Sequence, residues 1–289
     1  MEPLSRNIED YPEGLVLPID KPYRWTSADV IRKVKYAAIR HFGKKNLKVG
    51  HAGTLDPLAT GILLVCIGAA TKRAEQLQRS PKQYLAGVTF GATTPSYDLE
   101  KEIDTFYPLD SVSEESIEAV LPAFIGEQQQ VAPLFSAKSV DGTRAYETAR
   151  KLLKEAQRTG VPFDGAGILQ SSTICIHSLT LESFHPAGAP ATATATRAAD
   201  AIASNTTGFA RSERIHVADI GPATLPTAMI RVDCSKGTYI RSLARDLGEA
   251  LGSGAFLSSL RRTRNGGFDI EDSLSLDQTL ELFKTQTIL

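Results

Sequence analysis

The sequence predicts an α+β fold with a central mixed, largely antiparallel β-sheet flanked by helices and loops. Strand-like and helical segments are interspersed along the chain, without the regular βαβ alternation of a parallel sheet. The chain has 289 residues, of which 42% are hydrophobic, so it can bury a sizeable core. We expect a single domain over residues 1–289, with its core at about 13–275.

The N-terminal elements begin with a short apolar strand. Residues 13–22 read as this strand and a proline-containing turn, and Thr26 or Ser27 is suited to cap the helix that follows. Apolar residues then recur at helical spacing, which predicts a helix over residues 28–42. A basic loop follows at residues 43–48.

The later elements mix both types of secondary structure. Glutamates in the first turn of one expected helix suit the helix dipole, and Gly160 is suited to close another. In chain order, the patterns predict a helix at 70–78, a strand at 83–91, a polar loop at 92–104, a helix at 113–126, a helix at 145–160, a strand at 172–184, a strand beginning at Met229 and a helix at 243–252.

One segment differs in composition from the rest of the chain. Residues 186–222 are rich in Ala, Thr, Gly and Pro and have weak periodicity. The strand-like segments on both sides resemble neighbours in one sheet. We therefore interpret the segment as a surface insertion rather than as a linker between domains.

Composition and charge limit the possible function classes. The net charge of −1 means that attraction to a nucleic acid must come from local basic clusters. Three widely separated cysteines favour neither a disulfide framework nor a structural zinc site. The N-terminus has no secretory pattern and no apolar run is long enough to span a membrane, so we expect a cytoplasmic protein.

A single carboxylate stands out between Val49 and Arg73, in "VGHAGTLDPLATGILLVCIGAATKR". Asp56 is the only acidic residue of this run. The run lacks the Gly-Lys-Ser/Thr of a phosphate-binding loop, the five histidines are scattered, and no second acid lies nearby. These patterns do not favour a nucleotide triphosphatase, a metal site or hydrolysis by paired carboxylates.

Two interpretations of Asp56 remain open from the residues alone. Pro57 restricts the backbone of Asp56, and Gly53 and Gly61 permit a tight loop. A rigid carboxylate is suited to nucleophilic attack if a cation keeps it ionised. The alternative is that Asp56 only caps a turn, and spacing alone favours this second interpretation.

Five blocks of the sequence resemble the TruB-type tRNA pseudouridine synthases. They appear in the family's order and cover about residues 13–265, apart from the insertion, although Arg24 stands where the family usually has glycine. The blocks are "LPIDKPYRWTS", "GHAGTLDPLATGILLVCIGAATK", "KQYLAGVTFGATTPSYDLE", "APLFSAKSVDGTRAYETAR" and "CSKGTYIRSLARDLGEALGSGAFLSSLRRTR".

The resemblance implies a fold, an activity and a partner. It implies the pseudouridine synthase fold and isomerisation of uridine 55 in the T loop of tRNA, with base flipping, no cofactor and no metal. The partner would be the tRNA T arm, bound by a monomer without the C-terminal PUA domain of many relatives. Two alternatives remain open: a non-catalytic RNA-binding or tRNA-folding module, and a synthase that acts on another RNA.

The resemblance also assigns roles to single residues. Asp56 would be the nucleophile, and Arg241 would keep it ionised. Tyr84 would stack on the flipped base and handle the C5 proton, with Tyr239 in the same pocket. His51 would occupy the gap that the base leaves. The remaining predicted RNA-binding residues are the apolar wall Leu260 and the phosphate contacts Lys21, Lys72, Arg73, Lys82, Lys138 and Arg262.

Overall fold

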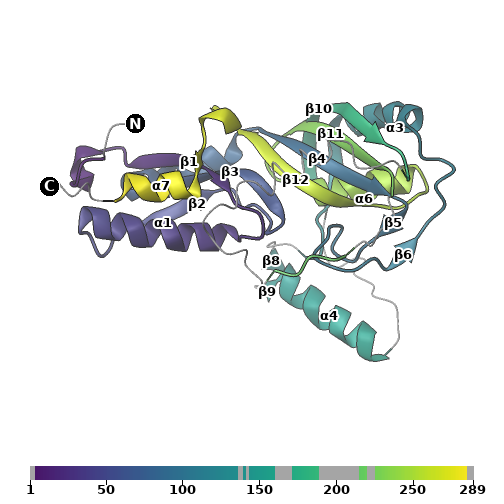
Figure 1. The fold of residues 1–289 in the computed structure, drawn as a ribbon, viewed down its shortest axis with the longest axis horizontal. Helices are drawn as coiled ribbons and strands as arrows, with labels where there is room; N and C mark the ends of the chain where they lie inside the picture. Colours follow the sequence, from purple (N-terminus) through teal and green to yellow (C-terminus); the bar gives the residue numbers. More distant parts are fainter. Residues whose placement is uncertain are drawn as a thin grey trace. The chain divides into compact units, whose positions relative to one another are not determined.

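The computed structural model describes residues 4–135, 139–140, 143–159, 171–188, 215–219 and 225–284 (Figure 1). The chain divides into two compact units. Unit 1 consists of Met1–Leu85, Ala191–Ile215 and Leu260–Leu289, and unit 2 of Ala86–Pro190 and His216–Ser259. Two strands, β4 (Lys82–Phe90) and β12 (Ala255–Asn265), contribute residues to both units.

Unit 1 is built on a mixed sheet with the strand order β14-β1-β3-β12-β4. β1 and β2 are antiparallel to β3, whereas β12 runs parallel to β3 and β14 parallel to β1. The remaining elements of this unit are β1 (Leu15–Lys21), α1 (Ser27–Phe42), β2 (Val49–Ala52), β3 (Ala59–Ile67), α2 (Ala74–Arg79), β13 (Phe268–Asp269), β14 (Leu274–Ser275), α7 (Leu276–Leu282) and 3-10 helices at Ile8–Asp10, Gly68–Arg73 and Ile270–Asp272.

Helix α1 follows from its sequence signals, and the prediction of this helix is confirmed. The Thr26 hydroxyl accepts a hydrogen bond from the backbone N–H of Asp29, and the Asp29 carboxylate accepts one from the N–H of Thr26. This capping box supplies partners for two of the backbone donors at the helix start. At the other end, Gly43 takes the left-handed conformation, with φ of 63°, that ends many helices.

Strand β3 forms the centre of unit 1, and the sequence patterns did not predict it. All nine residues of β3 are buried, so its sequence is a continuous apolar run without the alternation of a half-exposed strand. Ile62, Leu64 and Cys66 on one face pack with Ala52 and Ala70. The strand therefore holds the loop before it on a rigid base.

Unit 2 continues the mixed sheet with the order β12-β4-β11-β10-β7. Two small hairpins, β5–β6 and β8–β9, lie outside this sheet. The remaining elements of the unit are β5 (Ala92–Thr93), β6 (Thr105–Phe106), α3 (Glu114–Val120), a 3-10 helix at Leu121–Phe124, β7 (Gly126–Val131), β8 (Ser139–Val140), β9 (Thr143–Arg144), α4 (Ala145–Thr159), β10 (Ser171–His185), β11 (Thr227–Cys234) and α6 (Ile240–Ala250).

The predicted α+β class is confirmed, while some boundaries differ. Helix α3 ends at Val120 rather than at residue 126, because Pro122 cannot continue an α-helix and a 3-10 turn follows. β10 and β11 pair as antiparallel neighbours, as expected for the strands that flank the insertion. Most of the insertion, and Gly160, lie outside the described residues.

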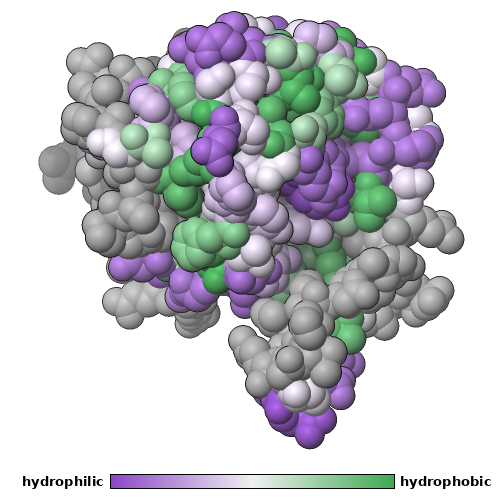
Figure 2. Space-filling model, turned by 90° about the vertical axis from the view of Figure 1, so that its right-hand side faces the viewer, coloured by the Kyte–Doolittle hydropathy of each residue, from purple (hydrophilic) through white to green (hydrophobic). Residues whose placement is uncertain are grey.

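The described surface carries few large hydrophobic side chains. Figure 2 shows hydrophobic residues, in green, as small groups among hydrophilic ones on one face. The large exposed hydrophobic residues are Tyr36, Phe106, Tyr107, Ile125 and Val131. Among the residues that the structure describes, none of the helices is both long and apolar enough to cross a bilayer.

Candidate active site

Asp56 lies in the loop that joins the antiparallel strands β2 and β3. The carbonyl oxygen of Asp56 accepts a hydrogen bond of 3.1 Å from the N–H of Ala59, which closes a turn with Pro57 in its second position. Proline is favoured at that position, because its fixed φ suits the turn. The Asp56 side chain is half-buried. The local sequence therefore defines both the turn and the position of the carboxylate at its start.

The residues on both sides of Asp56 are held by other elements of unit 1. The hydroxyl of Ser27, the first residue of α1, lies 3.0 Å from the N–H of Leu55 and 3.1 Å from its carbonyl oxygen. On the other side, the Lys21 ammonium donates to the carbonyl oxygen of Pro57 at 3.2 Å. These bonds restrict the backbone next to Asp56 before any substrate binds.

Lys21 is fully buried, and its ammonium is surrounded by backbone oxygens. It donates to Pro22 at 2.9 Å and Trp25 at 2.6 Å as well as to Pro57. Burial lowers the pKa of Lys21 to about 7, although the carboxylates of Asp56 and Asp20 act in the opposite direction. The predicted phosphate contact at Lys21 is therefore corrected: this side chain holds the loop and does not reach the surface.

Arg262 is a second buried cation that holds the loop. Its guanidinium donates to the carbonyl oxygens of Ile62 at 2.7 Å, Gly53 at 3.1 Å and Thr54 at 3.4 Å, and the residue is 1% exposed. A phosphate would have to replace these bonds to reach the guanidinium. The predicted phosphate contact at Arg262 is thus also corrected.

Gly61, the last residue of the "DPLATG" motif, is required by the close approach of β3 to β12. Its φ is 96°, and a Cβ atom there would lie 2.2 Å from the carbonyl oxygen of Arg262. The N–H of Gly61 donates to Asp20 at 3.0 Å, and the same carboxylate accepts a bond of 2.8 Å from Arg261. Any larger residue would push β12, and with it Arg262, away from the loop.

His51 and Leu260 lie near the two ends of the Asp56 loop. His51 is half-buried in β2, and its Nδ1 has no hydrogen-bond partner among the described atoms. Burial, followed by the positive charge of Arg262, lowers the pKa of His51. Leu260 of β12 is buried and lies in register with Ala59 of β3. The roles predicted for these two residues stay predictions.

Two further predicted residues lie on β4. Tyr84 is buried, 9% exposed, and its stacking and proton-transfer roles stay predictions. The Lys82 ammonium is also buried and donates to the carbonyl oxygens of Gln78 and Ser80. Like Lys21, Lys82 therefore closes a local turn instead of facing a phosphate, which corrects the prediction.

The remaining basic residues of the prediction have different surroundings. Lys72 and Arg73 are exposed on the 3-10 helix after β3. Arg73 forms an ion pair of 3.3 Å with Glu13, which offsets part of its charge. Lys138 lies outside the described residues. The predicted phosphate contacts at Lys72 and Arg73 stay predictions.

Arg24 stands where the family usually has glycine, and it keeps the backbone conformation of a glycine. Its φ is 61°, in the left-handed region that glycine adopts without strain. The Arg24 guanidinium donates to the carbonyl oxygen of Ile215 at 2.5 Å, which contributes to holding the strained residue in place. The backbone conformation is therefore that of a glycine, although the residue is not.

In unit 2, Arg241 is buried at the start of α6 and holds the loop after β5. Its guanidinium donates to the carbonyl oxygens of Phe135 at 3.0 Å and Ser96 at 3.3 Å. It also forms an ion pair of 3.5 Å with Asp98, and both side chains are at most 5% exposed. Asp98, in the "TPSYDLE" part of one of the five blocks, was not predicted as a partner of Arg241.

Tyr239 is the residue before α6, and Gln130 of β7 fixes it. The side chain of Gln130 accepts from the N–H of Tyr239 at 2.8 Å and donates to its carbonyl oxygen at 3.2 Å. The ring packs on the hydrophobic cluster that includes Phe135. Asp56 belongs to unit 1, whereas Tyr239 and Arg241 belong to unit 2. The predicted pairing of Asp56 with Arg241 stays a prediction.

Metal ligands do not cluster in the part of the chain that the structure describes. Within those ranges, no group of three or more His, Cys, Asp or Glu side chains could hold a metal ion. The chemistry that the described residues offer is that of a held carboxylate, buried cations and buried aromatic rings.

Two family models match the chain. One, described as TruB family pseudouridylate synthase (N terminal domain), matches residues 40–163. The other, described as tRNA pseudouridylate synthase B C-terminal domain, matches residues 241–287. The first range contains Asp56 and Tyr84, and the second contains Arg241 and Arg262.

Curated relatives share much of the sequence. The chain is 42% identical over 280 residues to a protein of Phocaeicola vulgatus named tRNA pseudouridine synthase B, which covers 96% of this chain and 97% of the relative. It is 37% identical over 268 residues to a protein of the same name from Deinococcus radiodurans, covering 92% and 78%.

Among solved structures, the chain resembles one titled "Crystal Structure of a Cbf5-Nop10-Gar1 Complex". The TM-score is 0.57 at 24% identity, over 95% of this chain and 56% of the solved one. The chain thus spans little more than half of that longer chain, and the likeness concerns the fold.

Proposed function

Because the chain belongs to the TruB family of pseudouridylate synthases, we propose that its Asp56 is the nucleophile that converts uridine 55 of the tRNA T loop to pseudouridine. The chain is a tRNA pseudouridine synthase, the activity for which relatives similar over almost its whole length are named. We expect the reaction in the cytoplasm, where tRNA is found, and expect a monomer to perform it.

The reaction rearranges one nucleotide without adding or removing atoms. The bond between N1 of uracil and C1′ of ribose breaks, and a bond between C5 and C1′ forms. The proton at C5 leaves, and N1 gains one. The product has the composition of the substrate, so the conversion needs no oxidant or reductant. Asp56 could attack C6 of the base or C1′ of the ribose, and either route requires a carboxylate that is held still beside the nucleotide.

The observation that carries the proposal is the restrained loop around Asp56. Ser27 fixes the residue before the carboxylate, Lys21 the residue after it, and Arg262 the start of the loop. A nucleophile that is positioned before the substrate arrives loses little freedom in the transition state. An aspartate that only capped a turn would not need three separate anchors.

We assign the remaining steps to the buried groups. A uridine inside a folded loop must leave its stack before Asp56 can reach it. Tyr84 would stack on the extruded base and accept the C5 proton, and Leu260 would form the wall opposite. Arg241 would keep Asp56 ionised, because a guanidinium stays charged even when buried. His51 would occupy the place of the extruded base.

The variant Asp56→Asn tests the nucleophile. Asparagine keeps the shape of the side chain but cannot form the covalent bond, so pseudouridine formation should fall at least about 1000-fold. The Kd for tRNA should stay within about threefold. Release of tritium from tRNA labelled at C5 of uridine measures turnover, and filter binding measures the Kd.

The exposed Asp272→Asn serves as the matched control and should keep full activity. Turnover by Asp56→Asn would refute the nucleophile assignment. Mapping pseudouridine in total RNA of a strain that lacks the gene tests the target. An unmodified uridine 55 supports the proposal, whereas an unchanged T loop with loss at another site would assign another RNA. Wild-type binding of tRNA without turnover would indicate a non-catalytic RNA-binding module.

A further inference from the structure

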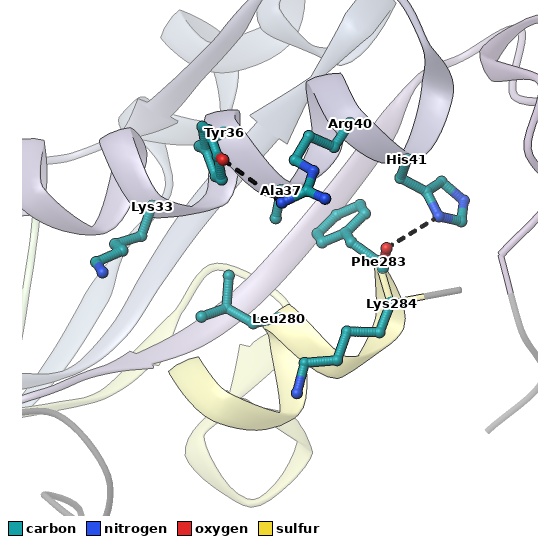
Figure 3. Close-up of a pocket in the computed structure, with 8 residues that line it drawn as sticks. All are labelled: Lys33, Tyr36, Ala37, Arg40, His41, Leu280, Phe283 and Lys284. Carbon is teal, nitrogen blue, oxygen red and sulfur yellow. Dashed lines mark hydrogen bonds between the residues drawn. The ribbon is translucent and has the colours of Figure 1, made fainter. Parts of the chain in front are cut away.

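A groove of about 400 Å³ lies between α1 and α7 in unit 1 (Figure 3). Its floor is apolar, because Ala37, Leu280 and Phe283 line it. Phe283 packs edge-on against Phe42 of α1, with ring centroids 6.2 Å apart. The backbone carbonyl of Phe283 also lies 3.3 Å from Nδ1 of His41. These contacts fix α7 against α1, so the groove is a formed feature of the fold.

The rim of the groove is positively charged. Lys33 and Arg40 come from α1, and Lys284 follows α7. None of the described residues that line the groove is acidic. Lys284 forms an ion pair with Glu281 at the surface, where solvent screens such pairs. The groove is therefore suited to an anion.

Helix α1 carries an excess of positive charge. Its sequence contains the four cations Arg32, Lys33, Lys35 and Arg40, and its only acid is Asp29. Asp29 pairs with Arg32 at 2.9 Å, on the first turns of the helix. The second half of α1, which borders the groove, has cations and no carboxylate.

An exposed aromatic ring stands beside these cations. Tyr36 is 64% exposed, and its ring does not contribute to the buried core. The Arg40 guanidinium lies 5.7 Å from the centre of this ring and donates to its hydroxyl at 3.4 Å. The ring and its hydroxyl hold the Arg40 guanidinium at the surface beside the groove. The proposed substrate of this chain is RNA, whose closely spaced phosphates suit such a set of cations.

The groove is separate from the loop of Asp56. Ser27, at the start of α1, holds that loop, whereas Arg40 lies near the end of the same helix. At 1.5 Å per residue, Arg40 lies about 20 Å along the helix axis from Ser27. That distance corresponds to about seven base pairs of an A-form RNA duplex at ~2.8 Å each.

We propose that the groove between α1 and α7 is a second RNA-binding site, which takes the phosphodiester backbone of the substrate about seven base pairs away from the modified uridine. The inference rests on the proposed function, since it extends the same RNA beyond the loop. The two ends of α1 would then have different tasks. The N-terminal end of α1 holds the nucleophile loop, and the C-terminal half binds backbone.

The triple variant K33Q/R40Q/K284Q tests the site with two RNAs. One is a full-length tRNA, and the other is a T-arm hairpin with a stem of four base pairs, which is too short to reach the groove. The Kd for the tRNA should rise on the order of tenfold, and the slope of log Kd against log salt should fall by about two to three. The Kd for the hairpin and the single-turnover rate at saturation should stay unchanged.

The matched control K44Q/R79Q/R158Q removes the same charge from cations that are paired with Glu9, Glu75 and Glu155. An unchanged Kd and salt slope in the groove variant would overturn the proposal, as would equal weakening by the control or equal weakening for the hairpin. Wild-type affinity for polyglutamate above that for tRNA, lost in the groove variant, would assign the groove to an acidic protein instead.

Thermal unfolding of each variant shows whether the fold is kept. If the triple variant is unstable, Tyr36→Ala provides a second test, because it removes the ring that holds the Arg40 guanidinium. The Kd should then rise for tRNA and stay unchanged for the hairpin. Pseudouridine formation by the wild type reports on the proposed function separately, because the Kd differences are measured without turnover.

Discussion

The ammonium of Lys21 lies among three backbone carbonyl oxygens, close to the carboxylates of Asp56 and Asp20. Three acceptors match the three N–H groups of a charged lysine. Burial nevertheless disfavours the charge and lowers the pKa of Lys21 from 10.5 to about 7. The three hydrogen bonds therefore favour the charged form of Lys21, whereas its burial beside the Asp56 loop disfavours that form.

This opposition has a consequence for stability at different pH values. Between pH 7 and 10.5 the unfolded chain binds a proton at Lys21 that the folded chain has lost. The free energy of unfolding that this group contributes should therefore rise with pH in this window. Relative to Lys21→Met, the Tm of the wild type should increase from pH 7 to pH 9, as measured by calorimetry. The exposed Lys236→Met serves as the control and should track the wild type. A constant difference between wild type and Lys21→Met would contradict the expectation.

The burial of three basic residues could not be predicted from the sequence. Lys21, Lys82 and Arg262 have the residue type of phosphate contacts, and all three are buried on backbone carbonyls. A sequence records charge but not exposure. Lys72 has the same type and is exposed, so only the fold distinguishes these two uses of a cation.

At the scale of elements, α1 is the part of unit 1 that the sequence predicted best. Its cap, its apolar spacing and its terminal glycine are all local signals. β3 was missed because a fully buried strand lacks alternation. Asp98 was missed because its ion pair with Arg241 joins segments far apart in the chain, which no local pattern encodes.

The first residue of α1 also connects the helix to the loop. Ser27→Ala would leave the buried N–H of Leu55 without its partner, which should destabilise the protein by about 1–3 kcal/mol. Asp56 is the next residue, so kcat should fall about tenfold or more while the KM for tRNA changes little.

Ser113→Ala is the matched control, since Ser113 caps α3 in unit 2. This variant should lose stability and keep kcat. Equal kcat values for the two variants would show that the Ser27 hydroxyl serves only stability. Thermal unfolding and single-turnover assays provide the two measurements.

At the scale of the whole molecule, the net charge of −1 gives no overall attraction to a polyanionic substrate. Attraction must then come from groups of cations, such as those of α1 and Lys72. Counterions that these groups release from the RNA make binding depend on salt and not on net charge.

With about four phosphate contacts, the affinity of the wild type for tRNA should therefore fall by about 50- to 150-fold between 50 and 200 mM salt. Titrations at several salt concentrations measure this slope. A flat dependence would mean that shape and base contacts dominate and that the cationic groups are ordinary solvated surface.

The support of Asp56 comes from distant parts of the chain, and this sets an order of events during synthesis. The loop and its first anchors, Lys21 and Ser27, leave the ribosome early, whereas Arg262 emerges only near the end. At about 5–20 residues per second, the nascent loop waits roughly 10–40 s for its last anchor. A chain that stops within this interval contains Asp56 but not the arginine that holds its loop.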